Sequence, residues 1–167
     1  VKEKKETFEE IVNQKRDIDK KITVIGVGGS GNNTLDDLVN LGVDYVKLIG
    51  IETAENEIKF NLVKEKLLIG SKTCKGRGTG ANPELGKLSV KEDEERIKKI
   101  LEGTKKLIIV AGFGGGTGTG ATPEIAKLAK KMDIPVAACI IEPFHFEGEI
   151  RRKNFISGIK RLKESVD

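Results

Sequence analysis

Short apolar runs alternate with amphipathic stretches along the chain, and this alternation is the clearest structural signal in the sequence. The apolar runs have the length and composition of buried strands, and the stretches between them have the periodicity of helices. Strands are predicted at residues 22–27, 45–51, 66–70, 105–113 and 134–142, and helices at 32–40, 89–101, 123–132 and 147–165. The helix at 89–101 begins with a capping-box signal from Ser89 and Glu92, and the helix at 123–132 has Pro123 in its first turn.

Strands that alternate with helices are joined by right-handed crossovers, which predicts an α/β fold. We expect a doubly wound, mostly parallel, Rossmann-like sheet with helices on both faces and the strand order 3-2-1-4-5. In that order the strands beginning at Ile22 and Leu107 lie side by side where the winding reverses, and ligands bind beyond the carboxyl ends of strands at such a point. Residues 1–21 are predicted to be a charged extension or surface helix, and residues 22–167 one nucleotide-binding domain.

Composition narrows the class of protein. The 167 residues are 37% hydrophobic and 34% charged, as in globular proteins, and no apolar run approaches the ~20 residues of a membrane span. The net charge of +4 comes with only 4% aromatic residues and with lysines that alternate with glutamates, which indicates solvated helix faces. We therefore expect a cytoplasmic protein without a nucleic-acid partner and without direct membrane insertion. Cys74 and Cys139 lack metal-ligand spacing and are expected to be free thiols.

Both strands at the predicted reversal point end in glycine. The first is followed by Gly26-x-Gly28-x-x-Gly31, a pattern that is weak by itself, and the second by seven residues of glycine and threonine only, 114–120. Backbone N–H groups and two helix dipoles would converge there on one cleft, an arrangement that holds phosphate anions. Thr117 and Thr119 would donate hydroxyl hydrogen bonds to phosphate, and a magnesium ion is expected near Thr117 without a side-chain ligand assigned to it. No Gly-Lys-Ser/Thr is present at Walker spacing, which excludes a P-loop.

Four segments in order carry a family resemblance. GGGTGTG at 114–120 resembles the tubulin signature, VIGVGGSGNN at 24–33 resembles the first phosphate loop of the FtsZ family, GTGANPELG at 78–86 its third, and PFHFEGEIRR at 143–152 its ribose-contacting segment. The FtsZ family comprises the tubulin-like GTPases of prokaryotic cell division, and the similarity extends over residues 22–167. The resemblance implies GTP or GDP with magnesium as ligands, filament assembly, other cell-division proteins as partners, and a location at the division site.

The resemblance also implies roles for single residues. Those expected against the nucleotide are Gly28, Gly29, Ser30, Gly31, Asn32, Asn33, Gly114 and Gly120; around the α- and β-phosphates Gly115, Gly116, Thr117, Gly118 and Thr119; near the γ-phosphate Thr79, Gly80, Ala81 and Asn82; near the ribose Pro143 and Glu147; and near sugar or phosphate Arg151. Glu147 and Arg151 also have the spacing of an ordinary surface ion pair. Valine at Gly116 is expected to place its Cβ where a phosphate oxygen would lie, and so to abolish binding.

Two departures from the family are visible. Glu52-Thr53-Ala54 stands where the family usually has Asn-Thr-Asp, which changes the acidic groups available for magnesium or γ-phosphate. The chain also stops before the central helix and the second domain of the family, so we expect the amino-terminal part of such a protein, a split half or a short relative. The acidic loop that completes GTP hydrolysis in a neighbouring subunit belongs to that second domain, and the 167 residues alone are expected to be inactive.

Two other functions remain open from the sequence. Glu52 follows Gly31 by 21 residues, as the ribose-binding acid of a dinucleotide-binding dehydrogenase would, although the second glycine loop argues against that class. A non-catalytic nucleotide-binding interaction module is the other alternative. The apolar run 134–141 is expected to associate with another copy of the chain or with a second half of the protein, because an open apolar strand edge favours pairing.

Overall fold

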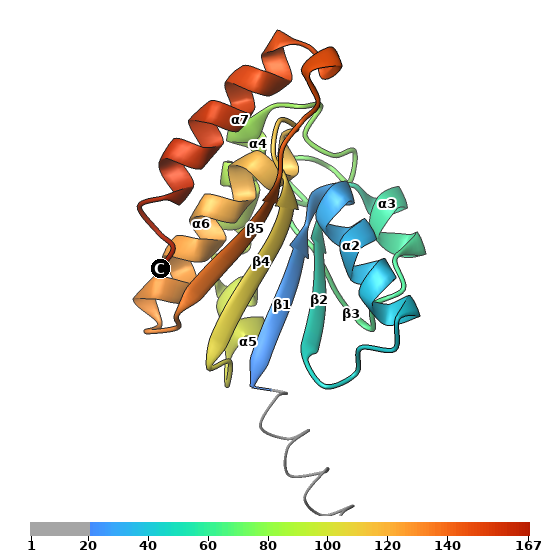
Figure 1. Cartoon of the computed structure of the whole chain (residues 1–167), viewed down its shortest axis with the longest axis vertical. Coiled ribbons are helices and arrows are strands. Elements are labelled where there is room, and N and C mark those ends of the chain that lie inside the picture. Colours follow the sequence, from blue (N-terminus) through green and yellow to red (C-terminus); the bar gives the residue numbers. More distant parts are fainter. Residues whose placement is uncertain (1–20) are drawn as a thin grey trace, which may run out of the picture.

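The fold is built around one parallel sheet, seen in a computed structural model that describes residues 21–167 (Figure 1). Its strands are β1 (Ile22–Val27), β2 (Lys47–Glu52), β3 (Glu65–Leu68), β4 (Lys106–Gly112) and β5 (Val136–Ile141). They lie in the order β3-β2-β1-β4-β5, with every neighbouring pair parallel. The predicted doubly wound topology is therefore confirmed. The predicted extension at residues 1–21 lies, except for Lys21, outside the described residues.

Helices cover both faces of the sheet (Figure 1). They are α2 (Gly28–Asn40), α3 (Glu55–Phe60), α4 (Pro83–Glu92), α5 (Glu94–Leu101), α6 (Thr117–Lys131) and α7 (Glu149–Leu162), with a 3₁₀ turn η1 (His145–Glu147) before α7. Alternate side chains of β1 enter two separate apolar clusters: Ile25 joins the one built with α4, α5 and α6, whereas Val24 joins the one built with α2. Within residues 21–167 no helix is long and apolar enough to cross a membrane.

The two helices at the centre of the fold begin earlier than their sequence pattern predicts. α2 starts at Gly28 rather than at residue 32, and α6 starts at Thr117 rather than at residue 123, so that Pro123 lies inside the helix instead of in its first turn. All residues of α6 from Thr117 to Pro123 are buried. Tertiary packing thus overrides the low helix propensity of glycine, and the glycine motifs form helix starts more than loops.

The predicted start of the helix at Ser89 is wrong. Ser89 lies inside α4, where its hydroxyl donates to the Leu85 carbonyl over 2.8 Å. α4 begins instead at Pro83, because the Asn82 side chain accepts a hydrogen bond from the Glu84 N–H over 3.0 Å and proline fits the first helical position. Asp93 then separates α4 from α5. The short helix α3 was not predicted, and the last helix is shorter than the predicted 147–165.

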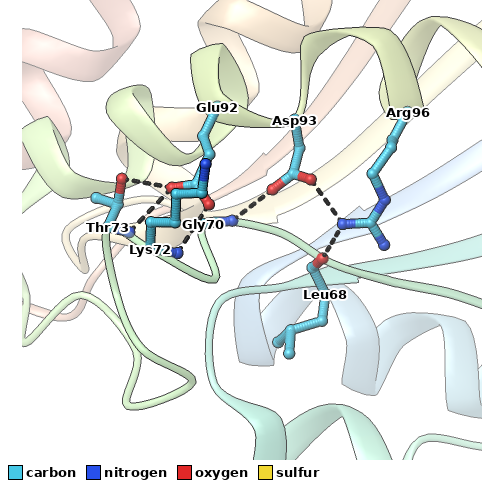
Figure 2. A network of polar contacts seen from close by, with 7 residues as sticks. All are labelled: Leu68, Gly70, Lys72, Thr73, Glu92, Asp93 and Arg96. Atoms are coloured by element: carbon cyan, nitrogen blue, oxygen red, sulfur yellow. Dashed lines mark hydrogen bonds and ion pairs between the residues drawn. The ribbon is translucent and has the colours of Figure 1, made fainter.

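Carboxylates at the junction of α4 and α5 hold the segment that follows β3 (Figure 2). Glu92 accepts hydrogen bonds from the Lys72 and Thr73 N–H groups over 2.7 and 2.9 Å and from the Thr73 hydroxyl over 2.8 Å. Asp93 accepts from the Gly70 N–H over 2.7 Å and pairs with Arg96 over 2.6 Å. These contacts fix the beginning of the chain segment that runs on to the glycine loop at 76–81.

Acid is expected to weaken this attachment. Although partial burial acts to raise the pKa of Glu92, the hydrogen bonds from Lys72 and Thr73 hold it below its ordinary value of 4.5. A carboxylate with a depressed pKa contributes stability above its unfolded-state pKa and loses it as the pH falls through the folded-state pKa. Glu92→Ala should therefore lower the free energy of unfolding by about 1 kcal/mol at pH 7, with the difference from wild type shrinking below pH 4.5.

Urea unfolding of both proteins at several pH values measures this difference. Glu95→Ala is the matched control, because within residues 21–167 the exposed Glu95 of α5 pairs only with Lys98, and it should change stability by less than about 0.5 kcal/mol. Equal effects of the two substitutions at pH 7 would contradict the stabilising role given to the Glu92 carboxylate.

Candidate functional site

A cavity of about 320 Å³ opens beyond the carboxyl ends of β1, β2 and β4, and we call it the cleft. This is the place where the winding of the sheet reverses. Its lining comes from five segments of the chain: Gly28, Gly29 and Ser30; Glu52, Ala54 and Glu57; Arg77, Gly78, Thr79, Gly80 and Ala81; Gly112, Phe113, Gly115, Gly116, Thr117 and Gly118; and Arg151. The two glycine motifs that the sequence places at neighbouring strand ends therefore meet in one hollow.

The N-termini of α2 and α6 abut at the bottom of the cleft. A Cβ atom on Gly28, which has a φ of +73°, would lie only 3.1 Å from the Gly118 nitrogen. Neither helix carries an acidic side chain in its first turn. The first N–H groups of both helices have no partner within their own helix and lie at the positive ends of two helix dipoles. The arrangement suits an anion such as phosphate.

Several glycines of the two motifs are required for close packing of the backbone. A Cβ on Gly31 would collide with the Val110 carbonyl, one on Gly118 with the Gly112 carbonyl, and one on Gly26 would come within 2.6 Å of the Gly31 carbonyl. These glycines let α2 approach β1 and β4, and let α6 approach β4. The spacing of the motif thus reflects helix-to-strand contact as much as ligand binding.

The expectation for Gly116 is wrong in its mechanism. A Cβ there would collide with the Thr79 side chain and lie 2.8 Å from the Asn82 nitrogen, so a side chain would push away the loop at 76–82 instead of filling the cleft. Gly115 behaves differently, because a Cβ on it meets nothing within 4 Å. Gly115 lines the cleft and has no left-handed φ. It is the position at which a side chain would extend into the cleft without meeting other atoms.

The structure brings about half of the residues expected at the nucleotide into the lining of the cleft: Gly28, Gly29, Ser30, Thr79, Gly80, Ala81, Gly115, Gly116, Thr117, Gly118 and Arg151. The others stand outside it: Gly31, Asn32, Asn33, Asn82, Gly114, Thr119, Gly120, Pro143 and Glu147. Asn32 and Asn33 line a second hollow of about 500 Å³, which shares Gly29, Ser30 and Glu57 with the cleft.

Some of the residues outside the lining have clear structural contacts. Asn32 is buried and donates to the Ile51 carbonyl over 3.1 Å, and the Thr119 hydroxyl accepts from the Gly114 N–H over 2.8 Å. One residue that sequence reasoning missed links the loops: the Asn154 amide on α7 donates to the carbonyls of Ala81 and Gly114 over 3.2 and 3.1 Å. These contacts hold both glycine loops and α7 in one arrangement.

Glu147 and Arg151 form the ion pair that their spacing allows. Glu147 lies in η1 rather than on the last helix, and its carboxylate accepts from the Phe144 N–H over 2.8 Å. Its second oxygen is 3.2 Å from the Arg151 guanidinium. Arg151 reaches the lining of the cleft, so the pair places one cation at the rim.

Arg77 and Glu57 line the cleft although sequence reasoning assigned them no role. Residue 77 forms an antiparallel bridge with Ala54, which places an exposed arginine across from the segment that follows β2. Glu57, on α3, lies over the start of α2, where its carboxylate would be 3.2 Å from a Cβ on Gly29. The cation in the glycine-rich run GRGTG was a usable signal for Arg77, whereas nothing in the sequence placed Glu57.

A chain of hydroxyl groups runs from a buried carboxyl to both walls of the cleft. Glu52, only 2% exposed, accepts a hydrogen bond from the Thr53 N–H over 2.7 Å and one from the Thr53 hydroxyl over 3.3 Å. The Thr53 and Thr117 hydroxyls are 2.7 Å apart, and those of Thr117 and Thr79 are 3.3 Å apart. Burial raises the pKa of Glu52 above its ordinary value, with a smaller contribution from the charge of Glu57 and against the hydrogen bonds from Thr53.

Comparison with known proteins identifies the family to which the chain belongs. The family model that describes the "Tubulin/FtsZ family, GTPase domain" matches residues 21–167. The chain belongs to the Tubulin/FtsZ family. The chain is 38% identical to cell division protein FtsZ 1 of Methanocaldococcus jannaschii and 44% identical to cell division protein FtsZ of Aquifex aeolicus, each over 147 residues. Each alignment covers 88% of this chain and 40% of the relative.

Solved structures of the family agree with the fold. An empty FtsZ dimer from M. jannaschii superposes with a TM-score of 0.89 at 37% identity, covering 95% of this chain and 46% of that one. The GDP-bound monomer of CetZ1 from Haloferax volcanii superposes with a TM-score of 0.81 at 28% identity, covering 87% of this chain and 48% of that one. The chain thus spans less than half the length of these relatives. The resemblance found in the motifs is confirmed, and the dehydrogenase alternative is not supported.

Proposed function

We propose that the chain is the guanine-nucleotide-binding part of a tubulin-like GTPase of cell division that assembles head-to-tail into filaments. The observation that carries the proposal is the convergence of the α2 and α6 N-termini on one cleft without an acidic side chain in either first turn. Membership of the Tubulin/FtsZ family and the GDP-bound state of CetZ1 support guanine nucleotide as the ligand. The relatives named as cell division proteins, and the FtsZ dimer, support division and self-assembly.

Within this proposal the phosphates lie between the two helix starts. The N–H groups of Gly29 and Ser30 and those of Gly115–Gly118 bind phosphate oxygens, and Arg77 and Arg151 neutralise charge at the rim. Of the residues expected from the resemblance, Asn32, Asn33 and Glu147 would contact the base or ribose only through the adjoining hollow or the rim.

Magnesium fits the cleft as a companion of the nucleotide. Among residues 21–167 no group of three metal-binding side chains is assembled, and Mg²⁺ typically keeps several waters and binds through substrate phosphates. Beside bound phosphates the ion would neutralise charge on them. We propose no side-chain ligand for it.

Thermal shift with GTP, GDP, ATP and NAD tests the proposed ligand. Only a guanine-specific tubulin-like site predicts a stabilisation by GTP and GDP that exceeds that by ATP, with no response to NAD. Stabilisation by NAD alone, or by none of the four, would overturn the proposal.

Turnover by these 167 residues alone is expected to be slow. The carboxylates that line the cleft are Glu52, which is buried, and Glu57, and neither is placed by contacts that would orient an attacking water. The resemblance places the activating acid in a neighbouring subunit. Phosphate release by a mixture of the chain and a full-length relative should therefore exceed the sum of the releases by the two proteins measured separately. Rapid release by the chain alone would contradict this, with Glu52 and Glu55 the first residues to replace.

Association through β5 is expected as well. β5 is an outer strand of the sheet. Asp167 bonds to the backbone of Val136 at the start of its outer edge, and no other strand of residues 21–167 pairs with that edge. Ala137, Cys139 and Ile141 of β5 are exposed. An exposed apolar edge favours pairing with another strand. Sedimentation of the chain should show self-association at high concentration, which Cys139→Lys should reduce. A strictly monomeric wild-type chain would contradict the expectation.

The setting of the activity follows from the same proposal. We infer a cytoplasmic protein that acts at the division site with other cell-division proteins. Fluorescent tagging of the protein in its own cells tests this, and a uniform distribution throughout the cell cycle would contradict it.

A further inference from the structure

Glu52 has a buried carboxyl group in the lining of the cleft, and one of its two oxygens lacks a hydrogen-bond partner among residues 21–167. Oε1 accepts from the Thr53 N–H and hydroxyl over 2.7 and 3.3 Å, whereas Oε2 is buried and has no partner among residues 21–167. A buried polar atom without a hydrogen-bond partner lowers the stability of the fold, so its presence calls for an explanation. Its location in the lining of the cleft, beside the site of phosphate binding proposed above, indicates what the explanation is.

The direction of the hydroxyl chain depends on the charge of Glu52. Each hydroxyl has one proton to donate. With Glu52 ionised, the Thr53 hydroxyl donates to the carboxylate, the Thr117 hydroxyl donates to Thr53, and the Thr79 hydroxyl donates to Thr117. All three hydroxyl protons then point toward Glu52. The hydroxyl oxygens present only lone pairs to the cleft, and lone pairs repel a phosphate.

Neutral Glu52 releases this constraint. A carboxyl that carries a proton on Oε2 is a weaker acceptor at Oε1, so the Thr53 hydroxyl is free to donate to Thr117. The hydroxyl protons of Thr117 and Thr79 can then turn toward a bound phosphate. Neutralisation also removes a negative charge from beneath the anion site.

We propose that Glu52 is a positioning residue that couples nucleotide binding to the uptake of one proton: through Thr53, Thr117 and Thr79 it turns hydroxyl donors toward the phosphates only when its carboxyl is neutral. The inference rests on the proposed nucleotide-binding function and deepens it. The proton comes from solvent and resides on the Glu52 carboxyl while the phosphate is bound.

The other charged groups around the cleft come from three elements. Glu57 on α3 opposes ionisation of Glu52, and Arg77 on the glycine loop and Arg151 on α7 also line the cleft. The first turns of α2 and α6 contribute no charged side chain, and Glu52 pairs along the sheet with Leu68 of β3. Burial raises the pKa of Glu52 in the free protein, and a bound phosphate would raise it further. Affinity is then constant below the free-state pKa and falls by up to about tenfold per pH unit above it.

Calorimetry of GDP binding without divalent metal tests the coupling. Titrations at one pH in two buffers of different ionisation enthalpy give the number of protons taken up, and a pH series gives the affinity. The wild type should take up as much as one proton per site, and its affinity should fall with rising pH. Glu52→Gln keeps the size and the acceptor oxygen but cannot ionise, so proton uptake at this site should be lost and the affinity should follow only the titration of GDP itself.

Three further variants distinguish an effect transmitted through the hydroxyl chain from a general electrostatic effect of the Glu52 charge. Thr53→Val removes the first hydroxyl and should reduce the proton uptake, whereas Thr122→Val, which removes a buried hydroxyl of α6 outside the cleft, should leave uptake and affinity unchanged. Glu57→Gln should retain the uptake. Equal proton uptake by wild type and Glu52→Gln, both binding GDP, would overturn the inference and leave the proposed function standing. Absence of GDP binding by the wild type at every pH would overturn both.

Discussion

Replacing Gly115 by valine is expected to abolish nucleotide binding while leaving the protein folded. A Cβ at this position meets no atom within 4 Å, and the position lines the cleft. The side chain would therefore fill the space between the two helix starts without displacing any part of the protein. We expect the affinity for GDP to fall about 100-fold or more, which corresponds to about 3 kcal/mol, with the Tm of the free protein nearly unchanged.

Binding calorimetry and thermal unfolding of the same preparation measure the two effects. Gly42→Asn is a suitable control, because Gly42 has a left-handed φ of +75° that asparagine tolerates and lies outside the cleft. It should bind GDP as the wild type does. Wild-type affinity in Gly115→Val would show that the phosphates lie elsewhere.

Replacing Gly118 by valine, three residues along the same motif, is expected to destabilise the fold itself. A Cβ there would collide with the Gly112 carbonyl and approach the Val27 carbonyl to 3.4 Å, so α6 would have to move away from β4 and β1. Backbone atoms cannot yield as a flexible side chain can. Overpacking of this kind should cost about 3 kcal/mol, or about 10 °C in Tm.

Urea unfolding of the Gly115 and Gly118 variants side by side tests this contrast. The same substitution in one short motif should damage binding at the first position and stability at the second. A Gly118→Val protein as stable as Gly115→Val would contradict the packing role assigned to Gly118.

The order of the strands was predictable from the sequence because the periodicity alternates so regularly. Five apolar runs separated by helical stretches leave few topologies once crossovers must be right-handed, and the two glycine motifs marked the point where the winding reverses. The family could be identified from the motifs for the same reason: they are long, and they occur in order.

The helix starts were less predictable because they depend on contacts made in the fold. Gly28 and Thr117 begin helices only because the surrounding strands and loops bury and hold those first turns. Asn82 caps α4, yet Ser89 offered a more familiar signal seven residues later. Local propensity is weak wherever tertiary packing supplies most of the stability of a helix.

The individual roles of site residues were the least predictable. Gly115 and Gly118 look alike in the sequence, and only the atoms around each one separate the position that faces open space from the one that packs against a carbonyl. Arg77 is placed at the cleft by a β-bridge to Ala54, and this bridge requires two segments that are far apart in the sequence to meet. The hydroxyl chain from Glu52 likewise joins side chains of three segments.

Within the proposed function, phosphates bind between the N-termini of α2 and α6. Backbone amide resonances of the isotope-labelled chain, followed as GDP is added, test it most directly. We expect the largest shifts at Gly29, Ser30 and Gly115–Gly118, since these N–H groups would donate to phosphate oxygens. Shifts gathered instead around the hollow lined by Val39, Leu48 and Leu62, with the helix starts unaffected, would contradict it.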